Sequence, residues 1–160
     1  MTGYVSVCGP SAADAPLLAA AEELGRGLAE RGHVVICGGL GGVMTAVARG
    51  AHEAGGVVVG FLPGLERREA NPWVTVALPT GLGEMRNPLI VRAADVVVAV
   101  GGSWGTLSEV ALAVRTGVPV ISLGGWSFLS AEGDDVADEP WIMRASKPDD
   151  ALALVDRWLP

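Results

Sequence analysis

The chain has 160 residues, of which half are hydrophobic and 18% are charged, which suits one domain spanning residues 1–160 and excludes general disorder. The net charge of −7 argues against a nucleic-acid partner, because such partners favour a basic face. The apolar runs are too short to cross a membrane, and the uncharged start, Met1–Tyr4, does not resemble a signal peptide. We therefore expect a soluble, cytoplasmic protein with no membrane partner.

Valine-rich runs alternate with helical patterns along the chain, which is typical of βαβ units. Several runs are apolar at consecutive positions, as in parallel strands that are covered on both faces. We predict a single-domain α/β protein with a Rossmann-like three-layer fold, in which helices cover both faces of a parallel sheet. In chain order, the predicted elements are strand Tyr4–Cys8, a helix over Leu17–Leu28, strand His33–Cys37, a helix over Val43–Ala51, strand Val57–Phe61, a loop over Pro63–Pro72, strands Trp73–Leu78 and Asp95–Val100, a helix over Leu107–Val114, strand Pro119–Leu123, a loop with a solvated acidic segment over Gly124–Pro140, and a helix from Pro148.

The scarcity of lysine, histidine and cysteine excludes several chemistries. Lys147 is the only lysine and precedes Pro148, away from any glycine loop, so a Walker phosphate loop and a pyridoxal phosphate Schiff base are not expected. The two histidines lie far apart in the sequence without clustered partners, and the two cysteines form no disulfide framework. We therefore expect no metal site and no pyridoxal phosphate.

Two glycine clusters each follow a predicted strand and precede a predicted helix. The first is Gly38–Gly42 and the second is Gly101–Thr106. At such junctions the free N–H groups of a helix N-terminus favour an anion, and glycine lets the ligand approach the backbone. In an open parallel sheet these loops line the crevice where ligands bind. The alternative is that the glycines only make tight turns.

The pattern does not fit a dinucleotide. Neither cluster has the Gly-x-Gly-x-x-Gly spacing, since Met44 stands where the last glycine of the first cluster is required, and the second strand ends in Ile36-Cys37 without the acidic residue that would bind a ribose. We therefore expect no NAD. A nucleoside monophosphate or another phosphate-bearing small molecule fits better.

Two charged residues accompany the second cluster. Glu109 is predicted to lie in the first turn of the following helix, and Arg86 precedes the strand that leads into this loop, so both side chains could reach one crevice, where arginine would bind phosphate. Each has a structural alternative. Glu109 would cap the helix in a capping box that begins at Thr106, and Arg86 would be an exposed residue ahead of an Asn87 cap and Pro88.

The segments Cys37–Met44 and Gly105–Glu109, with Arg86 ahead of the second, resemble the LOG-like family of Rossmann-fold proteins, formerly called "possible lysine decarboxylases". The LOG branch hydrolyses the N-glycosidic bond of cytokinin nucleoside 5′-monophosphates. The resemblance implies that Glu109 and Arg86 are the catalytic pair and that Gly102, Gly105 and Thr106 hold the phosphate. Family members are usually homodimers, so we expect a homodimer or a higher homo-oligomer. The resemblance extends from about Val5 to Leu123.

The sequence departs from the LOG motif at three places. Gly101 replaces its proline, Ser103 replaces its second glycine, and Met85-Arg86-Asn87 lacks its histidine. These variants are more similar to a short branch that includes molybdenum-cofactor carrier proteins, which bind a pterin phosphate without converting it.

Three functions therefore stay open: a nucleoside monophosphate phosphoribohydrolase, a non-catalytic carrier of a phosphate-bearing cofactor such as molybdopterin with Glu109 mainly a cap, and a ligand-gated interaction protein. The enzyme would use Glu109 to stabilise the cation-like ribosyl centre or to activate water. For Trp104 we consider contact with the ligand, contact with a partner subunit, and simple burial. The residues expected to contact the ligand are Ser11, Gly39, Gly41, Gly42, Gly102, Ser103, Trp104, Gly105 and Thr106.

Overall fold

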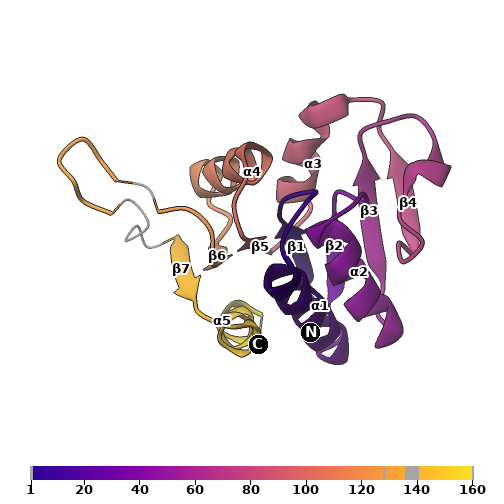
Figure 1. The fold of residues 1–160 in the computed structure, drawn as a ribbon, viewed down its shortest axis with the longest axis horizontal. Helices are drawn as coiled ribbons and strands as arrows, with labels where there is room; N and C mark the ends of the chain where they lie inside the picture. The colour runs from indigo at the N-terminus through magenta and orange to yellow at the C-terminus, as the bar shows by residue number, and fades with distance from the viewer. Residues whose placement is uncertain (1, 128, 136–140, 160) are drawn as a thin grey trace.

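Seven parallel strands form one sheet in the computed structural model, which describes residues 2–127, 129–135 and 141–159. The order across the sheet is β4-β3-β2-β1-β5-β6-β7 (Figure 1). This arrangement confirms the predicted α/β fold with a parallel sheet. The strands are β1 (Tyr4–Cys8), β2 (Val34–Cys37), β3 (Val58–Leu62), β4 (Val76–Pro79), β5 (Val96–Val100), β6 (Val120–Leu123) and β7 (Ile142–Ala145).

Helices cover both faces of the sheet and give the three layers (Figure 1). One face packs against α1 (Ala15–Glu30), α2 (Val43–Glu53) and α5 (Pro148–Trp158), and the opposite face packs against α3 (Asn87–Arg92) and α4 (Trp104–Arg115). Two short 3₁₀ helices, η1 (Arg67–Glu69) and η2 (Gly83–Arg86), lie in the connections on either side of β4. Valine, isoleucine and leucine side chains dominate both cores, as the apolar runs predict.

The prediction for β4 was wrong at its start. Trp73 and Val74 do not extend β4, because their N–H groups donate to the side chain and the carbonyl of Asn71, at 3.1 and 3.3 Å. These bonds close a turn, and the strand begins only at Val76. The short elements α3 and β7 were not predicted, and the expected loop Pro63–Pro72 contains η1.

The expected loop after β6 is only partly described, because residues 128 and 136–140 lie outside the described residues. Residues 131–134 of its acidic segment are exposed, as predicted, and Asp135 is half-buried. Asp135 forms an ion pair with Arg144 of β7, and Leu129 forms an isolated antiparallel bridge with Asp135. Only the end of this segment is therefore tied to the edge strand, and the rest of the described loop projects away from the sheet (Figure 1).

The turns after β1 and β2 pack directly on each other at the carboxyl edge of the sheet. Gly42, the cap of α2, has a φ of 63°, and a Cβ atom there would lie 2.4 Å from the Pro10 carbonyl oxygen. The Val43 N–H donates to the same carbonyl at 3.0 Å. Only glycine satisfies both the backbone angle and this close approach.

Within the described residues, no helix is long and apolar enough to cross a bilayer.

Candidate functional site

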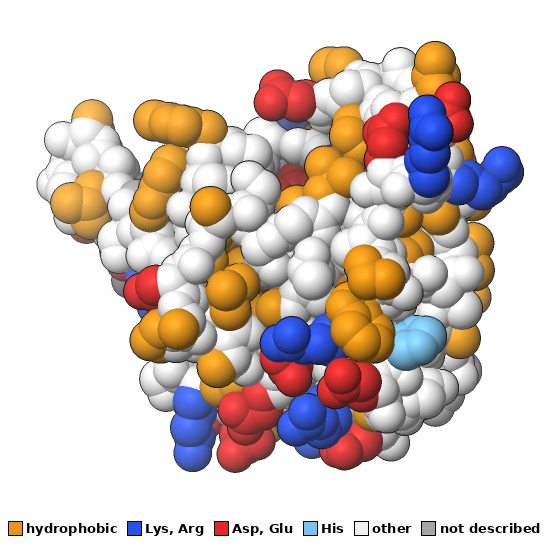
Figure 2. All heavy atoms as spheres, turned by 45° about the vertical axis from the view of Figure 1, so that its right-hand side comes forward, with side chains coloured by type: hydrophobic (Ala, Val, Ile, Leu, Met, Phe, Trp, Pro, Cys, Tyr) orange, Lys and Arg blue, Asp and Glu red, His pale blue; other side chains and the backbone are white. Residues whose placement is uncertain are grey.

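A cleft of about 400 Å³ opens at the carboxyl edge of the sheet. Its walls come from the turns after β1 and β2, from η2 and the start of α3, and from the first two turns of α4. The space-filling view shows acidic and basic side chains interspersed on the face drawn, rather than gathered into a basic patch (Figure 2). The residues that line the cleft are Val7, Cys8, Gly9, Ser11, Gly38, Leu40, Met44, Pro63, Glu84, Arg86, Asn87, Ser103, Gly105, Thr106 and Glu109.

The start of α4 leaves backbone N–H groups at one end of this cleft. Ser103 caps the helix, because its Oγ accepts the Thr106 N–H at 3.2 Å and lies 2.9 Å from the Thr106 hydroxyl. Among the described residues, the N–H groups of Trp104 and Gly105 have no protein acceptor. Gly105 is exposed, and no atom lies nearer than 3.9 Å to a Cβ placed there. An anion can therefore approach these donors closely.

Glu109 occupies the second turn of α4 and is 7% exposed. The alternative role of Glu109 in a capping box is excluded, because the helix begins at Trp104 and Ser103 is its cap. Burial raises the pKa of the Glu109 carboxyl to about 7, while a hydrogen bond with the Cys8 thiol and the charge of Arg86 act in the opposite direction. Among the described residues, no cation lies within 4.0 Å of this carboxyl. Glu109 is thus a buried acid that exchanges its proton near neutral pH.

Arg86 is 8% exposed and lines the cleft, which excludes the alternative of an exposed arginine. Its Nε donates to the Phe61 carbonyl at 3.0 Å, and its Nη1 donates to Asn87 Oδ1 at 2.9 Å. The third nitrogen, Nη2, has no protein acceptor among the described residues, and it lies 2.8 Å from the position of a Cβ on Gly38. The guanidinium is therefore fixed by two bonds and presents its remaining donors to the cleft.

Both cysteines are neutral thiols. Burial raises the pKa of Cys8 well above its usual value, and the Glu109 charge adds to this effect. Burial likewise raises the pKa of Cys37 to about 11, and its Sγ accepts the Gly39 N–H at 3.4 Å. A thiolate nucleophile is not favoured at either position. Cys8 nevertheless belongs to the site through its contact with Glu109, which its place at the end of β1 could have indicated.

The structure brings some of the predicted ligand residues together and not others. Ser11, Ser103, Gly105 and Thr106 line the cleft with Arg86 and Glu109. Gly39, Gly41, Gly42, Gly102 and Trp104 are not among the lining residues, and their contact with a ligand stays a prediction. A Cβ on Gly102 would lie 2.8 Å from the Trp126 ring, so packing by itself accounts for this glycine.

Trp104 is not buried, which contradicts one of the three possibilities considered for it. Its side chain is 79% exposed and meets the Trp126 ring edge to face, with centroids 5.0 Å apart. It lies beside the cleft rather than in it. Sequence reasoning assigned no ligand contact to Glu84, Pro63, Leu40 or Met44, although the last two lie within the quoted segment Cys37–Met44. In the described part of the chain, no group of three His, Cys, Asp or Glu residues could hold a metal ion.

The raised pKa of Glu109 predicts a pH-dependent effect of Glu109→Gln on stability. Between the unfolded value near 4.5 and the folded value of about 7, the folded protein holds a proton that the unfolded chain has lost, so stability falls as the pH rises through this window. We expect Glu109→Gln to be more stable than the unaltered protein. Its free energy of unfolding should be higher by up to about 3 kcal/mol at pH 8 and by less than about 1 kcal/mol at pH 5.

Urea denaturation at the two pH values measures this difference, with Glu53→Gln at an exposed position on α2 as the control. A gain from Glu109→Gln of the same size at both pH values would contradict a pKa near neutrality.

Comparison with known proteins agrees with the resemblance on which the site was predicted. The model of the SLOG cluster4 family, a LOG-like family, matches residues 2–152. An uncharacterized protein from Archaeoglobus fulgidus is 41% identical over 119 residues, which are 74% of this chain and 78% of that protein. The probable cytokinin riboside 5′-monophosphate phosphoribohydrolase LOGL5 from Oryza sativa subsp. japonica is 37% identical over 93 residues, which are 56% of this chain but only 38% of the rice protein.

Solved structures match over nearly the whole chain. The molybdenum cofactor binding protein from Rippkaea orientalis has a TM-score of 0.89 and 34% identity, covering 100% of this chain and 99% of that one. The molybdenum cofactor carrier protein from Chlamydomonas reinhardtii has a TM-score of 0.85 and 32% identity, covering 99% of both chains. DNA processing protein A from Helicobacter pylori, at 16% identity and a TM-score of 0.69, shares the fold. The chain belongs to the LOG-like SLOG cluster4 family.

Proposed function

We propose that this protein binds a nucleoside 5′-monophosphate in the cleft and hydrolyses its N-glycosidic bond. The observation that carries this proposal is the Glu109 carboxyl, which is buried in the cleft, free of an ion pair among the described residues and has a pKa raised to about 7. Groups tuned in this way are typical of acid–base catalysts. The name of the rice relative LOGL5 supports the same reaction class.

The start of α4 would hold the phosphate. The N–H groups of Trp104 and Gly105 and the hydroxyl of Thr106 supply donors there, and the helix dipole favours negative charge. Arg86 would then use Nη2 to orient the phosphate or the ribose. A partly protonated Glu109 repels the phosphate less than an ionised one would, which suits a cleft with few cations.

Hydrolysis follows from a carboxylate placed near the anomeric carbon. The C1′–N bond breaks and its electron pair leaves with the base, while the ribosyl carbon develops positive charge that Glu109 stabilises. The oxygen of a water molecule bonds to C1′, the ionised Glu109 accepts one proton of that water, and the departing nitrogen takes a proton from solvent. The products are the free base and ribose 5-phosphate. The proposal needs no metal, NAD or pyridoxal phosphate.

We expect Glu109→Gln to lower kcat/KM at least about 100-fold, because the amide cannot accept the proton. For the unaltered protein, kcat/KM should rise as the pH increases through about 7, since the ionised carboxylate is the active form. Chromatography of the released base, with AMP, GMP, CMP and UMP as substrates, measures both effects. No release from any nucleotide, by a protein that still binds one, would contradict hydrolysis.

A second candidate is a carrier that binds a phosphate-bearing pterin such as molybdopterin without converting it. The likeness to the two molybdenum cofactor proteins favours it, because that likeness spans nearly the full length of each chain while the rice match covers 56% of this one. A pterin that copurifies with the protein and stays intact in the absence of base release would support the carrier. In both forms the ligand is a small molecule rather than a nucleic acid, and a cytoplasmic location stays a prediction.

We also propose that the protein is a homodimer. The exposed indole of Trp104, beside Trp126 at the start of α4, supports this, because monomeric proteins seldom expose paired large aromatic rings. We expect a dimer in sedimentation velocity and a shift toward monomer for Trp104→Ala. Leu65→Ala, at an equally exposed position of 79%, should leave the dimer intact. A protein that stays monomeric at high concentration would refute the dimer. A Trp104→Ala variant that stays dimeric would refute the role of this surface as the dimer interface.

A further inference from the structure

The cleft extends from the start of α4 to η2. The strand that leads into α4, β5, and the strand to which η2 is hydrogen-bonded, β3, are separated in the sheet by β1 and β2. η2 is attached to β3 and the turn after it, because the Gly83 N–H donates to the Pro63 carbonyl at 2.9 Å and Arg86 Nε donates to the Phe61 carbonyl. A ligand whose phosphate lies at α4 therefore has its opposite end at η2.

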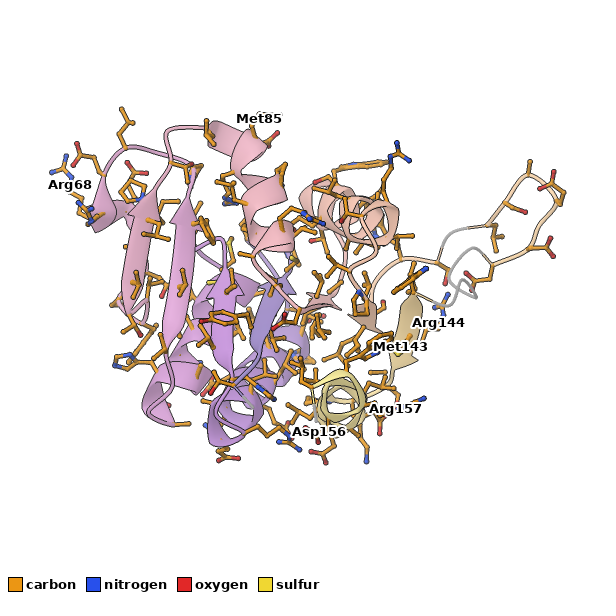
Figure 3. The ribbon with its side chains drawn as sticks, turned by 180° about the vertical axis from the view of Figure 1, so that it is seen from behind. Arg68, Met85, Met143, Arg144, Asp156 and Arg157 are labelled. Carbon is orange, nitrogen blue, oxygen red and sulfur yellow. The ribbon has the colours of Figure 1, made fainter. Side chains whose placement is uncertain are left out.

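The η2 end of the cleft combines apolar walls with one unpaired carboxylate. The Pro63 carbonyl accepts the Gly83 N–H, Met44 and Arg86 both lie against the position of a Cβ on Gly38, and Leu40 lines the same cleft. Glu84 is exposed at the mouth of the cleft that it lines, and its side chain makes no hydrogen bond or ion pair with the described residues. Asn87 is already engaged with Arg86 and Ser108. Next to Glu84, Met85 lies at the outer end of η2 and is 72% exposed (Figure 3).

Apolar walls beside a carboxylate suit a flat heterocycle whose faces pack and whose edge donates hydrogen bonds. An ionised carboxylate is acceptor-only and has two oxygens, so it matches two adjacent N–H donors. A 2-amino-4-oxopyrimidine ring offers such an edge, with a ring N–H beside an exocyclic amino group. Guanine and pterins share this edge, whereas adenine places an acceptor beside its amino group.

We propose that Glu84 is the specificity-determining residue of the cleft, and that its carboxylate selects ligands with a 2-amino-4-oxopyrimidine edge. This inference rests on the proposed binding of the phosphate at α4. It assigns the ring to the η2 end, away from the glycine cluster that precedes α4. The role of Glu84 applies both to an enzyme and to a carrier, because the ring must be bound before the ligand is hydrolysed or carried.

Isothermal titration of the Glu109→Gln variant tests Glu84 without hydrolysis of the ligand. GMP, IMP and AMP form a matched series, since IMP keeps the ring N–H of GMP and lacks only its amino group. We expect GMP to bind about tenfold or more tightly than IMP and AMP, as hydrogen bonds to a charged group require. Adding Glu84→Gln should remove this preference, while Glu53→Gln on α2, as the control, should preserve it.

The ratio of GMP to AMP affinity is the decisive readout, because loss of a negative charge changes the binding of both phosphates alike. A ratio that Glu84→Gln leaves unchanged, or an equal weakening of both nucleotides, overturns the role of Glu84. Absence of binding by every nucleotide and by 6-hydroxymethylpterin phosphate overturns the proposed function as well. Tight binding of the pterin phosphate alone, lost with Glu84→Gln, supports the same edge recognition and identifies the pterin as its source.

Discussion

The parallel direction of all seven strands is the constraint from which the site follows. Each strand ends at the same edge of the sheet, so the helices that follow β2 and β5 begin there side by side with the turn after β1. Their first N–H groups have no partner within the helix and point toward the edge. The glycines let these turns pack against one another, as Gly42 does against Pro10. A cleft with hydrogen-bond donors is therefore a consequence of the topology.

The chemistry of the cleft depends on two charged side chains that are both buried but not paired. Arg86 is held by the Phe61 carbonyl and the Asn87 side chain rather than by Glu109. Without a close cation, burial dominates the carboxyl of Glu109 and raises its pKa to about 7. A direct ion pair would hold the carboxylate permanently ionised and occupy the guanidinium. Their separation leaves one group able to exchange a proton and the other able to bind an anion.

Much of the scaffold could be predicted from local patterns, because five of the six predicted strands are apolar runs that begin within one residue of the observed strands. The site was harder to predict. Thr106 and Glu109 match a capping box as well as Ser103 and Thr106 match the observed cap. The anchor of Arg86 is a carbonyl 25 residues earlier in the chain, and Glu84 lines the same cleft as Glu109 only because the fold brings η2 and α4 to one edge of the sheet. Such long-range contacts leave no periodic signal in the sequence.

The central claim is that backbone N–H groups at the start of α4 hold the phosphate of a bound ligand, and a crystal structure of Glu109→Gln with GMP tests it most directly. The account predicts the phosphate within hydrogen-bond distance of the Gly105 N–H, with the ribose near Arg86. A phosphate bound elsewhere, for example beside the exposed Arg144 and Arg157 near α5 (Figure 3), would contradict it, as would a cleft that stays empty at saturating nucleotide.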